Sequence, residues 1–230
     1  MKTLGIIGGM SPESTVTYYN EINRLVNQKM GKNTSAPIVM VSVEFEEIVQ
    51  YQKTGQWERA GEILADSAKK LVQIGADGIV LATNTMHKVA PQIIEAINIP
   101  FLHILDATAD AIKAQGLTKV ALLGTRFTMQ DNFYREGLAQ RGIIAIVPND
   151  KVQTEIHRII FEELCIGQFI ETSKQFYLQT ITELAQLGAE GVILGCTEIG
   201  LLVQQEDFTL PFFDTAQLHS QMAAKFVLEK

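Results

Sequence analysis

The chain has 230 residues, of which 47% are hydrophobic and 20% are charged, and its formal net charge is −7. This composition excludes intrinsically disordered, collagen-like and coiled-coil proteins, and the length suits one large or two small domains. The negative charge argues against nucleic acid or an anionic membrane as a partner. No apolar run approaches the roughly 20 residues of a membrane span, and the first residues lack signal-peptide features, so we expect a cytoplasmic protein.

Short β-branched runs alternate along the chain with longer segments of helical periodicity. The runs are continuously apolar, which is typical of parallel strands buried on both faces, and the intervening segments are long enough for right-handed crossover helices. We therefore predict an α/β fold with parallel sheets flanked by helices. The predicted strands are residues 4–7, 38–43, 78–81, 101–104, 120–123, 192–194 and 211–213.

An internal repeat indicates that the chain has two similar halves. Residues 71–81 match residues 184–194 at a constant offset of 113 positions, and a Pro-Phe pair follows each copy. We therefore predict two pseudosymmetric α/β lobes. The first would contain residues 1–105 together with the C-terminal segment 210–230, and the second would contain residues 106–209.

The repeat also predicts where a ligand would bind. An α/β sheet binds ligands outside the carboxyl ends of its strands. If the two lobes face one another, four matched strand-to-helix turns would converge on one cleft between them. The offset of the repeat then pairs Thr83 with Cys196 on opposite sides of that cleft.

The segment after the first strand, residues 8–15, has the sequence Gly-Gly-Met-Ser-Pro-Glu-Ser-Thr. Ser11 is the predicted N-cap of a helix, and Pro12 is its predicted first residue. The glycine spacing does not match a dinucleotide-binding loop, and no Gly-Lys-Ser/Thr follows it. The backbone amides would suit a small anion such as a carboxylate, while a tight structural turn is the alternative.

Two further polar turns follow predicted strands. Thr-Asn-Thr at residues 83–85 is denser in hydrogen-bonding side chains than a single helix cap requires, which favours a polar pocket. Gly-Cys-Thr-Glu at residues 195–198 places a thiol near a helix N-terminus, whose dipole would favour the thiolate. A buried inert cysteine is the alternative for Cys196. Cys165 lies in a helical pattern and is predicted to be a packing residue.

Other catalytic motifs are missing from the sequence. No two of its four histidines have metal-ligand spacing on one helix face, and no Gly-x-Ser-x-Gly elbow is present. We therefore expect no metal and no other cofactor. Acidic runs such as residues 44–47 are usually solvated, although Glu47 follows a strand end and is a candidate to reach the cleft.

The three turns, in this order and at strand ends, resemble the aspartate/glutamate racemase family from end to end. The resemblance implies a two-lobed fold, commonly a homodimer, and a proton transfer at the substrate Cα without pyridoxal phosphate or metal. In that family two cysteines flank the substrate. Cys196 stands at the second of these positions, but Thr83 stands at the first. The chain is then either an asymmetric racemase, in which Cys196 abstracts and Thr83 donates a proton, or an enzyme whose chemistry has moved elsewhere.

The resemblance implies a small dicarboxylic amino acid as substrate, aspartate first and glutamate second. Many relatives carry Arg at the position of Ile48 and Lys at that of Cys165 to grip carboxylates, and this chain has neither cation. Glu47, His87 and Glu198 are expected to support catalysis. The expected substrate-binding residues are Asn84, Thr85 and Thr197, which match the family motifs, and Met10, Ser11, Gln52 and Thr128, which lie at the matched turns or within reach, with Arg126 a further candidate.

Two other functions stay open at this point. A single-cysteine carbon-acid enzyme, such as a malonate-type decarboxylase or a maleate isomerase, would keep the cysteine of the third turn. A catalytically inactive amino-acid binding module would keep the cleft alone. Against the first stand Met-Ser-Pro-Glu-Ser-Thr at residues 10–15 and Met-His-Lys at residues 86–88, which resemble the racemase branch.

Overall fold

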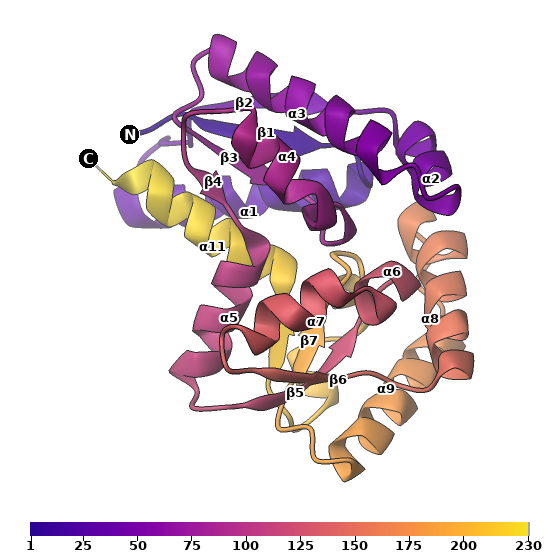
Figure 1. Cartoon of the computed structure of the whole chain (residues 1–230). Coiled ribbons are helices and arrows are strands. Elements are labelled where there is room, and N and C mark those ends of the chain that lie inside the picture. The colour runs from indigo at the N-terminus through magenta and orange to yellow at the C-terminus, as the bar shows by residue number, and fades with distance from the viewer. Residues whose placement is uncertain (230) are drawn as a thin grey trace. The chain divides into compact units, whose positions relative to one another are not determined.

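The computed structural model describes residues 1–229 and contains two four-stranded sheets (Figure 1). All strand pairs are parallel, and the strand orders are β2-β1-β3-β4 and β6-β5-β7-β8. The chain forms two compact units: unit 1 contains residues 1–104 and the segment from His219 on, and unit 2 contains residues 105–218. The predicted α/β class with parallel sheets is confirmed.

Unit 1 is built around the first sheet, with helices on both of its faces. Helix α3 packs on the face that presents Ile7, Ile79 and Leu81, and α1 and α11 lie on the other face (Figure 1). Each fully buried aliphatic side chain contributes about 1.5–3 kcal/mol. The elements are β1 (Leu4–Gly8), α1 (Pro12–Met30), β2 (Ile38–Ser42), α2 (Phe45–Lys53), α3 (Trp57–Gln73), β3 (Gly78–Leu81), the 3₁₀ helix η1 (Thr85–Val89), α4 (Ala90–Glu95), β4 (Phe101–Leu102) and the larger part of α11 (Thr215–Leu228).

Unit 2 repeats this plan around the second sheet. Alternate residues of its first strand enter two cores: Ala121 and Leu123 pack in one, and Val120 and Leu122 pack in the other. This alternation covers both faces, as expected for a parallel sheet. The elements are α5 (Ile104–Ala114), β5 (Lys119–Leu123), α6 (Arg126–Gln130), α7 (Asn132–Ala139), β6 (Ile144–Ile146), α8 (Asp150–Glu162), η2 (Leu164–Ile166), α9 (Glu171–Gln186), β7 (Val192–Leu194), α10 (Ile199–Leu202), η3 (Gln205–Asp207) and β8 (Phe212–Asp214).

The strand predicted at residues 101–104 is shorter in the structure, because β4 ends at Leu102 and α5 begins at Ile104. Two larger differences concern a whole strand and the boundary of a unit. Strand β6 was not predicted, although residues 143–147 form an apolar run that ends at Pro148. The segment 210–218 had been assigned to the first lobe, but β8 pairs with β7 and therefore belongs to unit 2. The cause is that the chain returns to unit 1 only at His219, inside α11, where no turn residue marks the boundary.

The described helices also bear on membrane association. Between residues 1 and 229, none of them is long and apolar enough to cross a membrane.

Candidate active site

In unit 1 three turns leave the same edge of the sheet. The register pairs Gly8 with Ser42 and Ile7 with Leu81, so the turns that follow β1, β2 and β3 start from neighbouring strands. Two hydrogen bonds tie these turns together. The Val43 amide donates to the Gly8 carbonyl at 3.0 Å, and the Ser14 hydroxyl donates to the Ala82 carbonyl at 3.1 Å.

The Gly9 turn, residues 8–11, is held by the first turn of α1. Ser11 is the N-cap and Pro12 opens the helix, as predicted. The Gly9 amide donates to the Thr15 hydroxyl at 2.8 Å, and that hydroxyl donates to the Ser11 carbonyl at 2.8 Å. The Gly9 amide therefore already has a partner inside the protein, as in the tight structural turn that is the alternative for this segment. The bridging role of Thr15 was missed, although this residue lies in the quoted motif.

The Thr83 turn, residues 82–85, is buried and polar. Thr83 is 9% exposed, and its amide donates to the Leu81 carbonyl at 2.9 Å. Asn84 and Thr85 are also buried, at the start of η1. Asn84 occupies the N-cap position, yet its side chain makes no capping hydrogen bond, so helix capping does not account for this polar residue.

Helix α2 contributes one buried and one exposed candidate. The Gln52 side chain is buried, and its amide nitrogen lies 3.1 Å from the Met86 sulfur of η1. Glu47 is exposed on the first turn of the same helix and accepts a hydrogen bond from the Tyr51 hydroxyl at 3.1 Å. Gln52 therefore lies next to the Thr83 turn, whereas Glu47 contacts a residue on its own helix.

Unit 2 carries the corresponding turns after β5 and β7. The Thr125 hydroxyl caps α6 by accepting from the Thr128 amide at 3.2 Å, and the two threonine hydroxyls lie 3.3 Å apart. Thr128 is fully buried. A side chain on Gly124 would meet the Gly195 carbonyl oxygen at 2.9 Å, so these two turns approach each other closely only because residue 124 is glycine.

The Cys196 turn, residues 195–198, contains a buried group of thiol, hydroxyl and carboxyl. The Cys196 thiol donates to Glu198 Oε2 at 2.9 Å, and the Thr197 hydroxyl donates to the same oxygen at 2.7 Å. Cys196 is 8% exposed and Glu198 is 2% exposed. One carboxylate oxygen thus accepts from both neighbouring side chains.

The surroundings of Cys196 favour the protonated thiol. Burial raises its pKa well above the ordinary value, and the negative charge of Glu198 raises the pKa further. The expected thiolate stabilised by a helix dipole is therefore wrong. Helix α10 has only four residues, Ile199–Leu202, and its short dipole is outweighed by burial and by the adjacent carboxylate.

A further residue near Cys196 was not singled out from the sequence. Tyr177 of α9 is fully buried in the same core cluster, and its hydroxyl has no hydrogen-bond partner within the described part of the chain. Burial raises its pKa well above the ordinary value, and negative charge on Cys196 adds to the effect. Its only signal in the sequence is a helical apolar stripe, which does not distinguish it from a packing residue.

The Thr83 and Cys196 turns occupy equivalent places in their own units. Thr83 follows the last residue of β3 by two positions, and Cys196 follows the last residue of β7 by two. In both units the residue between the strand and this position is held by the neighbouring strand. The Ala82 amide donates to the Ile7 carbonyl at 2.9 Å, and the Gly195 amide donates to the Leu123 carbonyl at 2.6 Å. The equivalence inferred from the repeat is confirmed at the level of each unit.

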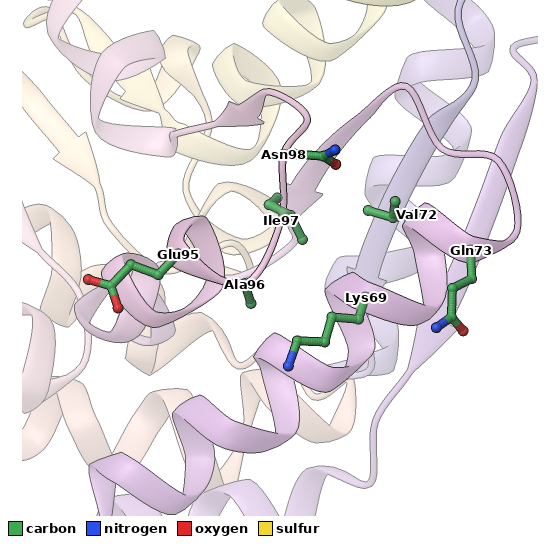
Figure 2. A pocket seen from close by; sticks show the side chains of 7 residues that line it. All are labelled: Lys69, Val72, Gln73, Glu95, Ala96, Ile97 and Asn98. Carbon is green, nitrogen blue, oxygen red and sulfur yellow. The ribbon is translucent and has the colours of Figure 1, made fainter.

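A surface hollow of about 420 Å³ lies elsewhere in unit 1 (Figure 2). It is formed by the end of α3 and by residues 95–98, which precede β4. It therefore opens at the amino-terminal edge of the sheet, away from the Thr83 turn. Throughout residues 1–229, no three His, Cys, Asp or Glu side chains gather closely enough to hold a metal ion.

Comparisons with known proteins give one consistent result. Residues 7–223 match the family described as Asp/Glu/Hydantoin racemase. The broad specificity amino-acid racemase RacX of Bacillus subtilis (strain 168) is 23% identical over 221 residues, which are 93% of this chain and 92% of RacX. A crystal structure from Yersinia pestis with a provisional Asp/Glu racemase assignment is 48% identical, with a TM-score of 0.93 and 100% of both chains covered. An aspartate racemase homologue from Pyrococcus horikoshii OT3 is 38% identical, with a TM-score of 0.87 over 100% of both chains.

Proposed function

We propose, from the premise that this chain belongs to the Asp/Glu/hydantoin racemase family, that it racemises aspartate and, as a second substrate, glutamate. The related proteins named above are described as racemases or their homologues, and racemases are enzymes of the isomerase class. The observation that carries the proposal is the buried thiol and carboxylate of Cys196 and Glu198 at a strand end equivalent to that of Thr83.

Cys196 is the proposed base, and Glu198 is the group that makes it one. A protonated thiol cannot take a proton, so the thiol first transfers its proton to the Glu198 carboxylate, 2.9 Å away. The thiolate then takes the hydrogen from the substrate Cα, and the electron pair of that bond stays on the substrate as a carbanion next to its carboxylate. This order of steps accounts for a catalytic thiol whose pKa is raised at rest.

Thr83 is the proposed proton donor to the opposite face of Cα. A hydroxyl is a much weaker acid and base than a thiol near neutral pH, so Thr83 acts as a relay: it gives its proton to the carbanion and recovers one from water. Glu198 then releases to water the proton that it took from the thiol, and Cys196 keeps the proton that came from Cα. The protons therefore balance, and the resting thiol and carboxylate are restored. The two proposed proton carriers, Cys196 and Thr83, therefore differ in acid and base strength. The proposal accordingly predicts slow turnover and unequal exchange from the two enantiomers, with the L-enantiomer faster.

The substrate carboxylates are proposed to bind neutral donors. Many relatives have a cation at two positions where this chain has Ile48, a fully buried aliphatic residue, and Cys165, a half-buried thiol. Neither side chain can carry a positive charge. Asn84 and Thr85 are buried polar residues of the Thr83 turn and offer amide and hydroxyl donors instead. The Thr197 hydroxyl donates to Glu198 at rest and is proposed to turn to the substrate when Glu198 takes the thiol proton. No cofactor is part of this proposal, because the chain carries neither a dinucleotide fingerprint nor metal-ligand spacing.

Incubation with L-aspartate and with D-aspartate in deuterated water tests the proposal. A racemase incorporates deuterium at Cα and forms the opposite enantiomer, which NMR and chiral chromatography detect. Activity is expected to survive a chelator and hydroxylamine. Absence of exchange on aspartate and glutamate, with carbon dioxide released from malonate, would instead identify a decarboxylase. Conversion of maleate to fumarate would identify an isomerase of that type, and binding without any reaction would identify an inactive module.

Assembly and location remain predictions. The family resemblance implies a homodimer, and light scattering on the purified chain would measure its mass. A mass near that of one chain at all concentrations would reject the dimer. Cell fractionation would test the expected cytoplasmic location.

A further inference from the structure

Each ring nitrogen of His87 makes a hydrogen bond to the backbone within unit 1. Its Nδ1 is 2.7 Å from the carbonyl oxygen of Thr83, and its Nε2 is 3.3 Å from the amide nitrogen of Ile104. The side chain is 2% exposed. His87 therefore links the Thr83 turn to the place where the chain leaves unit 1.

The two partners determine the protonation state of the ring. A carbonyl oxygen can only accept, so Nδ1 must carry the proton that is donated to Thr83. A backbone amide can only donate, so Nε2 must present its lone pair to Ile104. Only the neutral Nδ1–H tautomer satisfies both bonds, because a second ring proton would face the Ile104 N–H.

The surroundings keep the ring neutral. Burial lowers the pKa of His87 well below its ordinary value, and the nearby rings of His103 and His219 lower the pKa further. The His103 ring lies 4.6 Å from that of His87, and the His219 ring lies 5.8 Å away. His219 holds the same segment from another side, since its Nε2 lies 2.7 Å from the Leu102 carbonyl oxygen.

We propose that His87 is the positioning residue of the Thr83 turn. The Thr83 amide is already held by the Leu81 carbonyl at 2.9 Å, so the bond from His87 to the Thr83 carbonyl fixes the second end of that residue. With both backbone groups held, the direction of the Thr83 Cα–Cβ bond, from which the hydroxyl extends, is set by the fold. The catalytic meaning of this device rests on the proposed function, in which Thr83 carries a proton.

The equivalent place in unit 2 shows that this device belongs to one turn only. At the offset of the repeat, His87 corresponds to Gly200. Gly200 lies in α10 beside the Asp214 carboxylate and has no side chain that could hold the backbone of the Cys196 turn. Unit 2 instead holds its reactive group directly, through the bond from the Cys196 thiol to Glu198. Thr83, whose hydroxyl is the weaker acid and base, is thus held through its backbone, whereas the Cys196 thiol is held through its own hydrogen bond to a carboxylate.

Two variants separate the two bonds of His87. In His87→Asn the amide nitrogen occupies the place of Nδ1 and keeps the donor to Thr83, while the bond to Ile104 is lost. In His87→Gln the amide oxygen occupies the place of Nε2 and keeps the acceptor for Ile104, while the donor to Thr83 is lost. Each variant loses one hydrogen bond, so urea unfolding is expected to show similar losses of stability for both.

The first readout is Cα deuterium exchange from each enantiomer of aspartate. We expect His87→Gln to slow exchange from the enantiomer that depends on Thr83 by a factor on the order of ten to a hundred, because small misplacements of a reacting group have large effects on rate. Exchange from the enantiomer that depends on Cys196 should change far less. His87→Asn should keep the wild-type ratio of the two rates. Equal ratios in both variants would overturn the proposal.

The second readout needs no enzyme activity. In a Thr83→Cys background, the introduced thiol reports the order of the turn through its alkylation rate with iodoacetamide, measured on the separated peptide. Adding His87→Gln should change this rate several-fold, and adding His87→Asn should leave it nearly unchanged. If the chain proves inactive on amino acids, this result still supports or overturns the positioning role. Detection of the Nε2–H tautomer of His87 by nitrogen NMR would also overturn it.

Discussion

A thiol that donates its proton to a buried carboxylate is at rest the acid of a pair rather than a base. In Cys196 and Glu198 the atoms involved are 2.9 Å apart, and the same oxygen also accepts from Thr197. The pair can hold a proton on sulfur or on oxygen, and the Thr197 hydroxyl stabilises the carboxylate when sulfur has the proton. The chemistry of this residue is therefore that of a pair, which the sequence motif alone does not reveal.

The first prediction concerns the thiol itself. Cys196→Ala should lower racemisation by a factor on the order of a hundred to ten thousand, because a positioned proton-transfer group has that effect on rate. Circular dichroism and urea unfolding should show a folded chain. The matched control is Cys165→Ala, which removes the other thiol and should retain most of the activity. A fully active Cys196→Ala variant would reject the proposed base.

The second prediction separates thiol ionisation from catalysis. Glu198 raises the pKa of Cys196, so Glu198→Gln should lower that pKa and increase the alkylation rate of Cys196 by iodoacetamide at pH 7–8. Turnover should nevertheless fall, because the acceptor for the thiol proton is lost. Peptide-resolved mass spectrometry measures alkylation, with Cys165 in the same sample as the internal reference. Slower alkylation in Glu198→Gln would contradict this role for the carboxylate.

At the scale of elements, the turns at the strand ends carry the proposed catalytic residues. Much of them could be predicted from sequence: Ser11 caps α1, Pro12 opens it, and Thr83 and Cys196 stand at equivalent strand ends. The protonation of Cys196 could not, because it depends on burial and on a contact with Glu198 that only the turn conformation creates. Strand β6 was missed although its apolar run was visible.

The third prediction uses the equivalence of the two turns. Thr83→Cys should increase exchange from the slower enantiomer on the order of tenfold or more, because a thiol ionises far more readily than a hydroxyl. Exchange from the faster enantiomer should change much less. Thr83→Ser keeps a hydroxyl and is the control, expected to behave like the wild type. Equal rates for the two enantiomers in the wild type, or an unchanged ratio in Thr83→Cys, would show that Thr83 is not the second proton carrier.

The fourth prediction concerns the backbone of the Gly9 turn. Gly9 has a φ of +93°, and a Cβ there would collide with the Val43 carbonyl oxygen. Gly31 has a φ of +73° but open space around it. Gly31→Ala should therefore cost about 1–3 kcal/mol of unfolding free energy from backbone conformation alone, because its φ of +73° with a ψ of −173° is adopted almost only by glycine. Gly9→Ala should cost about 1–3 kcal/mol more, from overpacking. Urea unfolding measures both, and equal losses would contradict the close approach of β2.

For the whole molecule, the repeat in the sequence predicted the duplicated plan but not its boundaries. Both units have the same strand order, and the match between residues 71–81 and 184–194 made this visible in advance. The chain passes from unit 1 to unit 2 after Ile104 and returns to unit 1 at His219, which lies within the continuous helix α11. A helix that continues from one unit into the other shows no break in its periodicity, so pattern reasoning places the boundary too early.

The fifth prediction is the pH dependence of stability. The folded pKa of His87 is lowered, so as the pH falls below about 6.5 the unfolded chain binds a proton that the folded chain does not, and stability decreases. The folded pKa of Cys196 is raised, so above about pH 8.5 the unfolded chain loses a proton that the folded chain keeps, and stability again decreases. Urea unfolding from about pH 5 to 9.5 should show a maximum between these limits. His87→Asn should flatten the acidic side and Cys196→Ala the alkaline side; unchanged slopes would contradict the assignment.

The path of α11 also determines the order in which the protein can be completed on the ribosome. Unit 2 is one continuous segment, whereas unit 1 needs the residues from His219 on. The Val227 carbonyl accepts from the Lys2 amide at 2.9 Å, and the Phe226 ring lies against Gly78 at the start of β3. A nascent chain therefore leaves the part of its first sheet that α11 covers exposed until the residues from His219 on have been synthesised. The sheet that is synthesised first is therefore the last to be fully covered.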